Sequence, residues 1–480
     1  MSAPSIDMNT PAIKKNKNHH ASAQSSRSAV VSPARQAAFQ TLRRVEEDGA
    51  FASVLLAAAD DEGLRADDRA LCYELVLGVL RRQLWLDCLI EHYARRDARS
   101  LDAPVRRALR LGLYQLRFLA RVPQSAAVNE SVNLVKQVRL TSAASFVNAV
   151  LRRAAREPDY DPAANIIDPI RRLAVETSHP EHLIERWTQA FGSDHTRAFA
   201  YANNDIPPTA FRLTNATLCA QQQRREFDGD DIFEKLRAAG GELQSSAIAP
   251  ESWRIAGAGS ALRELARAGV IYIQDEASQL IAHVLDAGAG DRVLDVCAAP
   301  GGKTTHIAMK MNDEAFIVAG DVHEHRLRTV LEACARQKIK SVSSVVFDAA
   351  SALPFPENSF ERVLVDAPCS GTGTLRRNPE IRWRIQNSDI AILAAQQTMI
   401  LARAAQMVRR RSGRLLYSTC SVETEENEAV VDKFLSDNTN FRQLPVNVTD
   451  SLKTASGAAR TWPQRDGSDG FFIALFERVM

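Results

Sequence analysis

The chain has 480 residues, of which 45% are hydrophobic and 25% are charged, with 60 Lys and Arg against 58 Asp and Glu. This length is too great for one ordinary core and predicts two or three domains. The composition is typical of a soluble globular protein, and no apolar run is long enough for a membrane helix. A net charge of +2 does not by itself indicate a nucleic-acid partner.

The N-terminus and the cysteines bear on where the protein resides. Residues 1–33 are polar and aperiodic and lack the apolar core of a secretory signal, so we expect a disordered tail. The cysteines form no Cys-x-x-Cys pair and show no zinc-type spacing with histidine. An odd, scattered set without a signal peptide predicts a reducing cytoplasm, no disulfides and no metal centre.

Residues 34–158 have the pattern of a helical bundle. Apolar side chains recur every three or four residues in four successive segments, and no alternating strand pattern interrupts them. Between 34 and 158 there are 20 Lys and Arg against 15 Asp and Glu, an excess of five. This excess favours a polyanion partner only weakly, because helix surfaces are usually charged.

A linker and a small second unit follow the bundle. Residues 157–169 contain three prolines and no periodicity, which is typical of a linker. After a helix over 179–192, strand-like pieces at 209–214 and 242–248 flank a helix over 230–241. We therefore predict a small α/β subdomain over 170–265.

From residue 266 onward, apolar strands alternate with helices, which predicts an α/β fold with a mostly parallel sheet. Ligands of such sheets bind at the carboxyl ends of the strands. Six residues with chemical potential fall at predicted strand ends, namely Asp295, Asp321, Asp348, Asp366, Cys369 and Cys420.

The Gly-rich turn APGGKTT, residues 299–305, suggests a cofactor site. Position 297 is Cys where a phosphate loop needs Gly, which argues against a kinase or NTPase, and the dinucleotide fingerprint is absent. Asp321 is placed to accept the hydroxyls of a ribose, and Asp348 to meet an adenine amino group. This pattern predicts S-adenosylmethionine, with simple helix capping by the acids as the alternative.

Two cysteines at strand ends indicate the chemistry. Cys369 follows Asp-Ala-Pro, and Cys420 precedes an acidic, helix-opening run. A thiolate that adds to carbon 6 of a pyrimidine makes carbon 5 nucleophilic, and a second thiol can assist release. Asp366 can stabilise the charge that builds on the ring. The alternative for each cysteine is a small buried hydrophobic residue.

Four segments carry a resemblance to a known family: DVCAAPGGKT from 295, VDAPCSGTG with RRNPEIRW from 365, YSTCSVETEENE from 417, and DGSDGFFIALF from 466. They resemble the motifs of the NOL1/NOP2/Sun-type RNA (cytosine-5-)-methyltransferases, and the similarity begins at about residue 170. The segment 34–158 resembles a NusB-like RNA-binding domain. This pairing is similar to that of the bacterial 16S rRNA (cytosine-5-)-methyltransferases of the Sun/Fmu type.

The resemblance implies a Rossmann-like methyltransferase sheet over 266–480 with an antiparallel last strand. It implies that Cys420 is the nucleophile, that Cys369 assists product release and that Asp366 serves catalysis. It implies S-adenosyl-L-methionine as cofactor and 16S rRNA as partner for a cytoplasmic protein without membrane or metal; nothing demands more than a monomer. The implied cofactor contacts are Cys297, Ala298, Ala299, Pro300, Gly301, Gly302, Lys303, Asp321, Asp348 and Asp366.

Several alternatives remain open from the sequence. A DNA cytosine methyltransferase would use the Pro-Cys cysteine as nucleophile, and a non-catalytic RNA-binding protein would need neither thiol. Three roles are open for Lys303, which are to orient the cytosine, to orient Asp366 or to close the Gly-rich loop. We expect phosphate contacts from Arg376, Arg377 and Arg382. We expect structural roles for Cys72, Cys88, Cys219 and Cys334.

Overall fold

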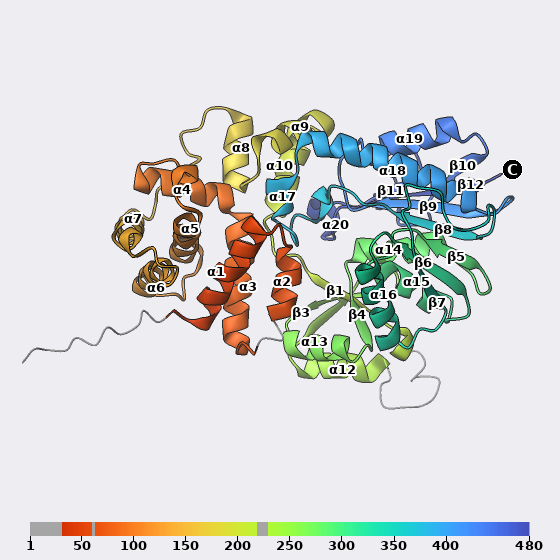
Figure 1. Cartoon of the computed structure of the whole chain (residues 1–480), viewed down its shortest axis with the longest axis horizontal. Helices are drawn as coiled ribbons and strands as arrows, with labels where there is room; N and C mark the ends of the chain where they lie inside the picture. The colour runs from red at the N-terminus through yellow and green to blue at the C-terminus, as the bar shows by residue number, and fades with distance from the viewer. Residues whose placement is uncertain (1–30, 60–62, 218–228, 480) are drawn as a thin grey trace, which may run out of the picture.

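The structure, a computed structural model, describes residues 31–59, 63–217 and 229–479. Most of the expected tail, residues 1–30, and Cys219 lie outside these ranges. The N-terminal domain is helical as predicted and lies beside the rest of the chain (Figure 1). Its apolar faces, including Phe39, Leu109 and Leu151, meet in one core. Its α-helices are α1 (Pro33–Glu47), α2 (Ala52–Ala59), α3 (Ala66–Arg81), α4 (Gln83–Ala94), α5 (Ala103–Phe118), α6 (Gln124–Gln137) and α7 (Ala144–Arg156).

Three short helices connect this domain to the C-terminal region. They are α8 (Pro169–Thr177), α9 (Glu181–Phe191) and α10 (Ser193–Ala202), of which only α9 was predicted. Trp187 of α9 is fully buried and packs edge-on against Phe199 of α10. The same core includes Leu375 and Trp462 from the C-terminal region, so these helices belong to the packing of both parts.

The small subdomain contains an antiparallel sheet in the order β2-β3-β1-β4, against which α12 and α13 pack. Its fourth strand lies beyond residue 265 and pairs with β1. The helices and strands are β1 (Thr209–Leu213), α12 (Gly229–Ala238), β2 (Glu242–Ser245), β3 (Ser252–Ala256), α13 (Gly259–Arg267) and β4 (Ile271–Ile273).

The C-terminal domain contains the predicted, mostly parallel sheet, in the order β10-β12-β9-β8-β5-β6-β7. Its parallel core strands are short apolar runs, as expected for strands covered on both faces. The last strand, β12, runs antiparallel to β9, as predicted. The bounds are β5 (Arg292–Asp295), β6 (Phe316–Asp321), β7 (Val342–Val346), β8 (Arg362–Asp366), β9 (Arg414–Thr419), β10 (Phe441–Leu444), β11 (Ala459–Arg460) and β12 (Phe472–Arg478).

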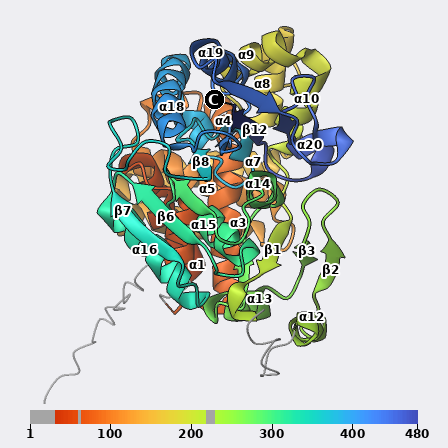
Figure 2. The same ribbon diagram turned by 90° about the vertical axis from the view of Figure 1, so that its right-hand side faces the viewer.

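Helices cover both faces of this sheet and close two apolar cores (Figure 2). One layer is α14 (Glu276–Leu285), α15 (Gly302–Lys310) and α16 (Glu324–Arg336), and the other is α18 (Asn387–Met407) and α19 (Glu428–Asp437). Two single-turn helices, α17 (Ile381–Arg384) and α20 (Pro463–Asp466), lie in the connections. In the described ranges, no helix combines the length and apolarity needed to cross a membrane. The predicted α/β class is confirmed. The order of the parallel strands reverses between β5 and β8, and ligands of such sheets bind beside this point, at the carboxyl ends of the strands.

Candidate active site

The two strand-end thiols meet at the centre of the site. β8 and β9 are parallel neighbours in which Asp366 pairs with Ser418, so Cys369 and Cys420 follow at the same edge of the sheet. Their Sγ atoms are 3.3 Å apart, and both cysteines are free. The hydrogen bond with Cys420, together with burial, holds the pKa of the Cys369 thiol well above its usual range. Cys369 is therefore a protonated thiol at neutral pH.

The buried carboxylate of Glu426 fixes both cysteine loops, a role that the sequence analysis did not assign. It accepts hydrogen bonds from the backbone N–H of Ser370 (2.9 Å) and from the Ser370 and Ser421 hydroxyls (both 2.5 Å). The Gln397 amide donates a further bond at 2.9 Å. Glu426 thus ties the residue after Cys369 to the residue after Cys420. Its place in the acidic run that follows Cys420 was the available signal.

Asp366 and Lys303 form a partly buried ion pair beside the thiols. The Lys303 Nζ lies 2.6 Å from Asp366 Oδ2, and the Ser418 hydroxyl donates to Oδ1 at 2.8 Å. Burial alone would lower the pKa of Lys303, but Asp366 outweighs it, and the pKa is raised. Cys420 also contributes to this rise. Lys303 therefore stays charged and contacts Asp366, one of the roles that the sequence left open.

A hollow of about 420 Å³ opens at the carboxyl ends of β5, β6 and β8. Its wall includes both thiols and the three acids predicted to contact a cofactor, Asp321, Asp348 and Asp366. From the predicted turn, Cys297 and Ala299 line it. The remaining predicted turn residues lie outside this lining, namely Ala298, Pro300, Gly301, Gly302 and Lys303.

The strand-end acids also order their own turns. Asp295, Asp321 and Asp348 each accept a hydrogen bond from the backbone N–H two residues later, at 3.3, 3.0 and 2.9 Å. Asp295 is fully buried and also accepts from the Thr304 hydroxyl at 2.7 Å, and burial raises its pKa to about 7. Asp295 therefore braces the turn, whereas Asp321 and Asp348 order their turns and also line the hollow.

A second hollow, of about 440 Å³, lies against the same two thiols. Its wall is formed by residues between 369 and 389, by Cys420, and by Phe51 of the N-terminal domain. Cys369 and Cys420 line both hollows. The thiol pair therefore lies where a ligand in one hollow can meet a ligand in the other.

The predicted phosphate contacts are wrong for Arg376 and Arg382, two of the three arginines after Cys369. Arg376 and Arg382 are buried, and Arg377 pairs with Asp275 (2.8 Å) and Asp469 (2.9 Å). Arg382 donates to backbone carbonyls at the carboxyl ends of α3, α8 and α10. These helix ends carry partial negative charge, which matches the guanidinium. The arginines hold domains together instead of facing RNA.

The other described cysteines differ from the thiol pair. Cys72 and Cys334 are buried, and burial raises the pKa of each thiol, and that of the half-buried Cys88, to about 11. This agrees with the expected structural roles. Cys297 lines the cofactor-side hollow, and burial holds its pKa well above the usual range. A protonated Cys297 is a poor nucleophile.

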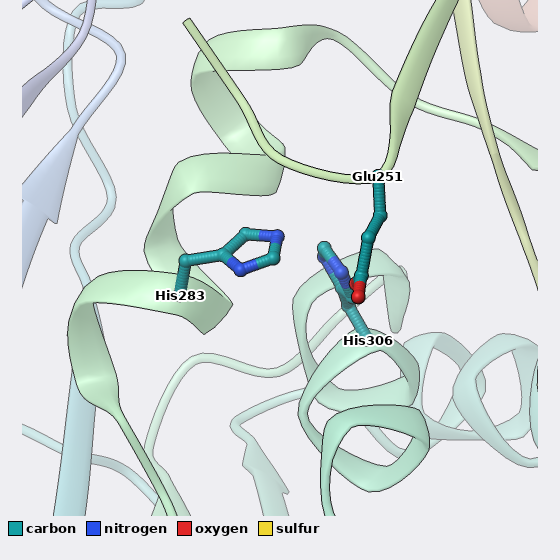
Figure 3. Close-up of side chains that lie close together, drawn as sticks. All are labelled: Glu251, His283 and His306. Atoms are coloured by element: carbon teal, nitrogen blue, oxygen red, sulfur yellow. The ribbon is translucent and has the colours of Figure 1, made fainter. Parts of the chain in front are cut away.

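Within the described ranges, Glu251, His283 and His306 form a group with metal-ligand atoms within 4.8 Å of one another (Figure 3). The imidazoles lie on α14 and α15, and Glu251 precedes β3. Burial lowers the pKa of both histidines, and the Lys310 charge adds to this effect. The Lys310 Nζ lies 3.7 Å from the Glu251 carboxylate and competes for the one anionic ligand. We therefore assign no metal to this group.

The sequence matches the family described as 16S rRNA methyltransferase RsmB/F over residues 282–477, and the NusB family over 32–156. A probable ribosomal RNA small subunit methyltransferase B of Bacillus subtilis (strain 168) is 34% identical, covering 92% of this chain and 98% of that protein. The corresponding Synechocystis protein (strain ATCC 27184 / PCC 6803 / Kazusa) is 35% identical, covering 93% and 99%. The crystal structure of PH0851 is 27% identical with a TM-score of 0.78, covering 94% and 100%. The chain thus belongs to the 16S rRNA methyltransferase RsmB/F family and has a NusB-family domain at its N-terminus.

Proposed function

We propose that this protein transfers a methyl group from S-adenosyl-L-methionine to carbon 5 of a cytosine in small-subunit rRNA, through a covalent bond between Cys420 and the base. The observation that carries the proposal is the pair of free thiols, 3.3 Å apart, shared by two hollows. Family membership and the names of the relatives support rRNA methylation as the reaction class. The cytosine specificity and the adduct rest on the thiols.

The cofactor-side hollow suits S-adenosylmethionine, which when bound supplies a methyl group on a positively charged sulfur. Asp321 and Asp348 line this hollow, and we assign Asp321 to the ribose hydroxyls and Asp348 to the adenine. The other hollow is open to a base on the opposite side of the thiols. This arrangement lets carbon 5 of a bound cytosine meet the methyl group while carbon 6 faces a sulfur.

The Cys420 thiolate forms a bond to carbon 6, and the electron pair of the 5,6 double bond becomes available at carbon 5. Carbon 5 then takes the methyl group, and the cofactor sulfur keeps the electron pair of the broken bond. The Asp366–Lys303 pair, at 2.6 Å, lies on the cofactor side of the thiols, and we assign to it the stabilisation of charge that develops on the ring. Loss of the carbon 5 proton restores the double bond and expels the Cys420 thiolate.

Cys369 is suited to the release step because its acidity depends on Cys420. The Cys420 sulfur is the largest cause of the raised pKa of Cys369. In the adduct that sulfur is a neutral thioether, so this cause disappears, and the pKa of Cys369 falls toward the raised value that burial maintains. The thiolate fraction of Cys369 therefore rises on adduct formation, and this thiolate accepts the carbon 5 proton after its own proton has passed to solvent.

The test compares Cys369→Ala and Cys420→Ala with small-subunit rRNA and S-adenosylmethionine. We expect Cys369→Ala to accumulate a protein–RNA band that survives denaturation, and Cys420→Ala to give neither band nor 5-methylcytosine in digested RNA. Cys88→Ala, in the N-terminal domain, is the control and should retain full activity. A band only with Cys420→Ala would exchange the two roles. Methylation by both variants without a band would overturn the covalent mechanism.

A further inference from the structure

Phe51 brings the helical N-terminal domain into the wall of the second hollow, the one of about 440 Å³. It lies between α1 and α2, and 46% of its side chain surface is exposed. The other residues of that wall, including Cys369 and Cys420, come from the C-terminal domain. An aromatic ring kept exposed at the mouth of a reactive site presents a stacking surface.

Contacts across the domain interface fix the backbone on the C-terminal side of Phe51. The Glu380 carboxylate accepts a hydrogen bond from the backbone N–H of Ala52 at 2.8 Å, at the start of α2. This caps a helix end from another domain. The Ser53 hydroxyl also bonds the Asn378 side chain at 3.0 Å. Both partners belong to the loop that follows Cys369, so Phe51 is held in register with the thiols.

Arg384 supports the ring itself. Its guanidinium lies 5.4 Å from the centroid of the Phe51 ring, within the range of a cation–π contact. The same guanidinium donates to three backbone carbonyls at the end of α1 and in the following loop, those of Val45, Gly49 and Ala50, at 3.0, 2.9 and 2.7 Å. Those bonds occupy three of the five N–H donors of Arg384 and fix its guanidinium beside the ring, so Arg384 acts as a support for Phe51.

We propose that Phe51 stacks on the unpaired base adjacent to the target cytosine, so that the NusB-family domain completes the RNA-binding site. This inference rests on the proposed function. A cytosine attacked at carbon 6 must leave its stack, which deprives the neighbouring base of its partner. The hollow that holds the thiols extends to Phe51, so the chain that carries the cytosine passes the ring.

The lining favours a base over a phosphate as the occupant. Apart from Phe51, the hollow includes the apolar side chains of Ile381 and Ile385. The Asp389 carboxylate, also at the wall, accepts from the backbone N–H of Gln386 at 2.9 Å and would repel a phosphate. An aromatic ring beside apolar side chains binds the face of any nucleobase.

The test is a double-mutant cycle between protein and RNA. The methylated cytosine is first mapped in small-subunit rRNA, and short RNAs are made with an abasic residue at each flanking position in turn. For Phe51→Ala we expect about a tenfold higher KM for RNA, from the loss of one stacked base, with an unchanged KM for S-adenosylmethionine. Phe51→Trp should restore the wild-type KM. Phe316→Ala, 52% exposed at the start of β6 and remote from both hollows, is the matched control.

The cycle gives a result that a purely structural role of Phe51 would not produce. One abasic position should weaken binding to the wild type about tenfold and leave Phe51→Ala unchanged. The stacking role would be overturned if the wild type forms 5-methylcytosine but the effects of Phe51→Ala and of the abasic residue on binding are additive at every position. An unchanged KM of Phe51→Ala for RNA would overturn it as well. If the wild type forms no 5-methylcytosine, it is the proposed function that fails, and the inference fails with it.

Discussion

The stretch VDAPCSGTGTLRRNPEIRW, residues 365–383, has two halves with opposite surroundings. In the first half, Asp366 and Cys369 line a hollow that is open to a ligand. In the second, Arg376 and Arg382 are buried, and Arg382 bonds the carboxyl ends of helices from other parts of the chain. Both halves are polar and adjacent in sequence, yet one faces a ligand and the other faces protein.

The difference shows that the partner available to a polar side chain decides its role. Asp366 shares its charge with Lys303, and one side of the pair still meets the hollow. Arg382 is fully buried among protein acceptors, including the Ser178 carbonyl at 3.1 Å and the Asn204 side chain at 2.9 Å, so RNA cannot reach its guanidinium. The proposed chemistry therefore belongs to the first half, and the second half holds together the parts of the chain around it.

Replacing Asp366 with Asn tests the first half and should have the largest effect. The change keeps the shape but removes the negative charge that pairs with Lys303 and that, in the proposed mechanism, stabilises the reacting ring. We expect kcat to fall about 100- to 1,000-fold, as for loss of one preorganised electrostatic group. Single-turnover methyl transfer to small-subunit rRNA measures this.

Asp286→Asn is the control for this charge change. Asp286 also pairs with a cation, Arg414, at 2.9 Å, but follows α14 and lies outside the lining of both hollows. Its activity should match the wild type. Equal decreases in kcat in Asp366→Asn and Asp286→Asn would mean that Asp366 affects catalysis only through the stability of the fold.

Replacing Arg382 with Ala tests the second half. The change leaves several buried carbonyls without a donor, and each costs about 1–3 kcal/mol. We expect the free energy of unfolding to fall by about 3 kcal/mol, allowing for partial relaxation, as measured by the urea midpoint. Arg409→Ala, whose side chain is 59% exposed in a surface ion pair with Glu361, should change stability by about 0.5 kcal/mol or less. Similar shifts in the two variants would contradict the interface role.

Sequence patterns could predict the first half better than the second, for a physical reason. The positions of Cys369 and Cys420 follow from strand ends, and parallel neighbours bring strand ends together at any twist of the sheet. The fate of Arg382 depends on α3, α8 and α10, whose placement is a long-range packing result. Helix α8 was missed because its nine residues adjoin the proline-rich linker.

The same limit explains why Phe51 and Glu426 were not selected. Phe51 reaches the hollow only because α2 begins against Glu380, more than 300 positions away. Glu426 lies in an acidic run whose other members give no sign that this one is buried. The residues that line the open hollow can be predicted from a few strand ends, whereas the residues of an interface can be predicted only from the positions of all the elements that meet there.

His306 of α15 is a buried polar side chain that, unlike Arg382, has no hydrogen-bond partner among the described residues. Burial, followed by the charges of Arg212, His283 and Lys310, holds its pKa well below 6.5, and neither ring nitrogen has a hydrogen-bond partner among the described residues. Below pH 6.5 the imidazole of His306 binds a proton in the unfolded chain but stays neutral in the folded chain. Stability is therefore complete above pH 6.5 and falls below it, by about 1.4 kcal/mol one pH unit lower for this residue.

His306→Asn should remove this part of the pH dependence of the urea midpoint. His283, whose pKa is also lowered, retains its own contribution, so the slope decreases without vanishing. His325→Asn, at an exposed position of α16, serves as the control and should leave the slope as in the wild type. An unchanged slope in His306→Asn would show that the buried imidazole already carries a proton in the folded chain.

Arg377→Gln gives the smallest expected effect and the sharpest contrast between the two halves. A phosphate contact releases counterions, so removing one lowers the slope of log affinity against log salt by about 1. Arg377 is instead neutralised by Asp275 and Asp469, at 2.8 and 2.9 Å, and has no such counterions to release. Filter binding to small-subunit rRNA over a range of salt should therefore give the wild-type slope, even where the broken ion pairs lower stability. A slope reduced by about 1 would mean that Arg377 leaves its carboxylates for RNA, and the second half would then face the substrate after all.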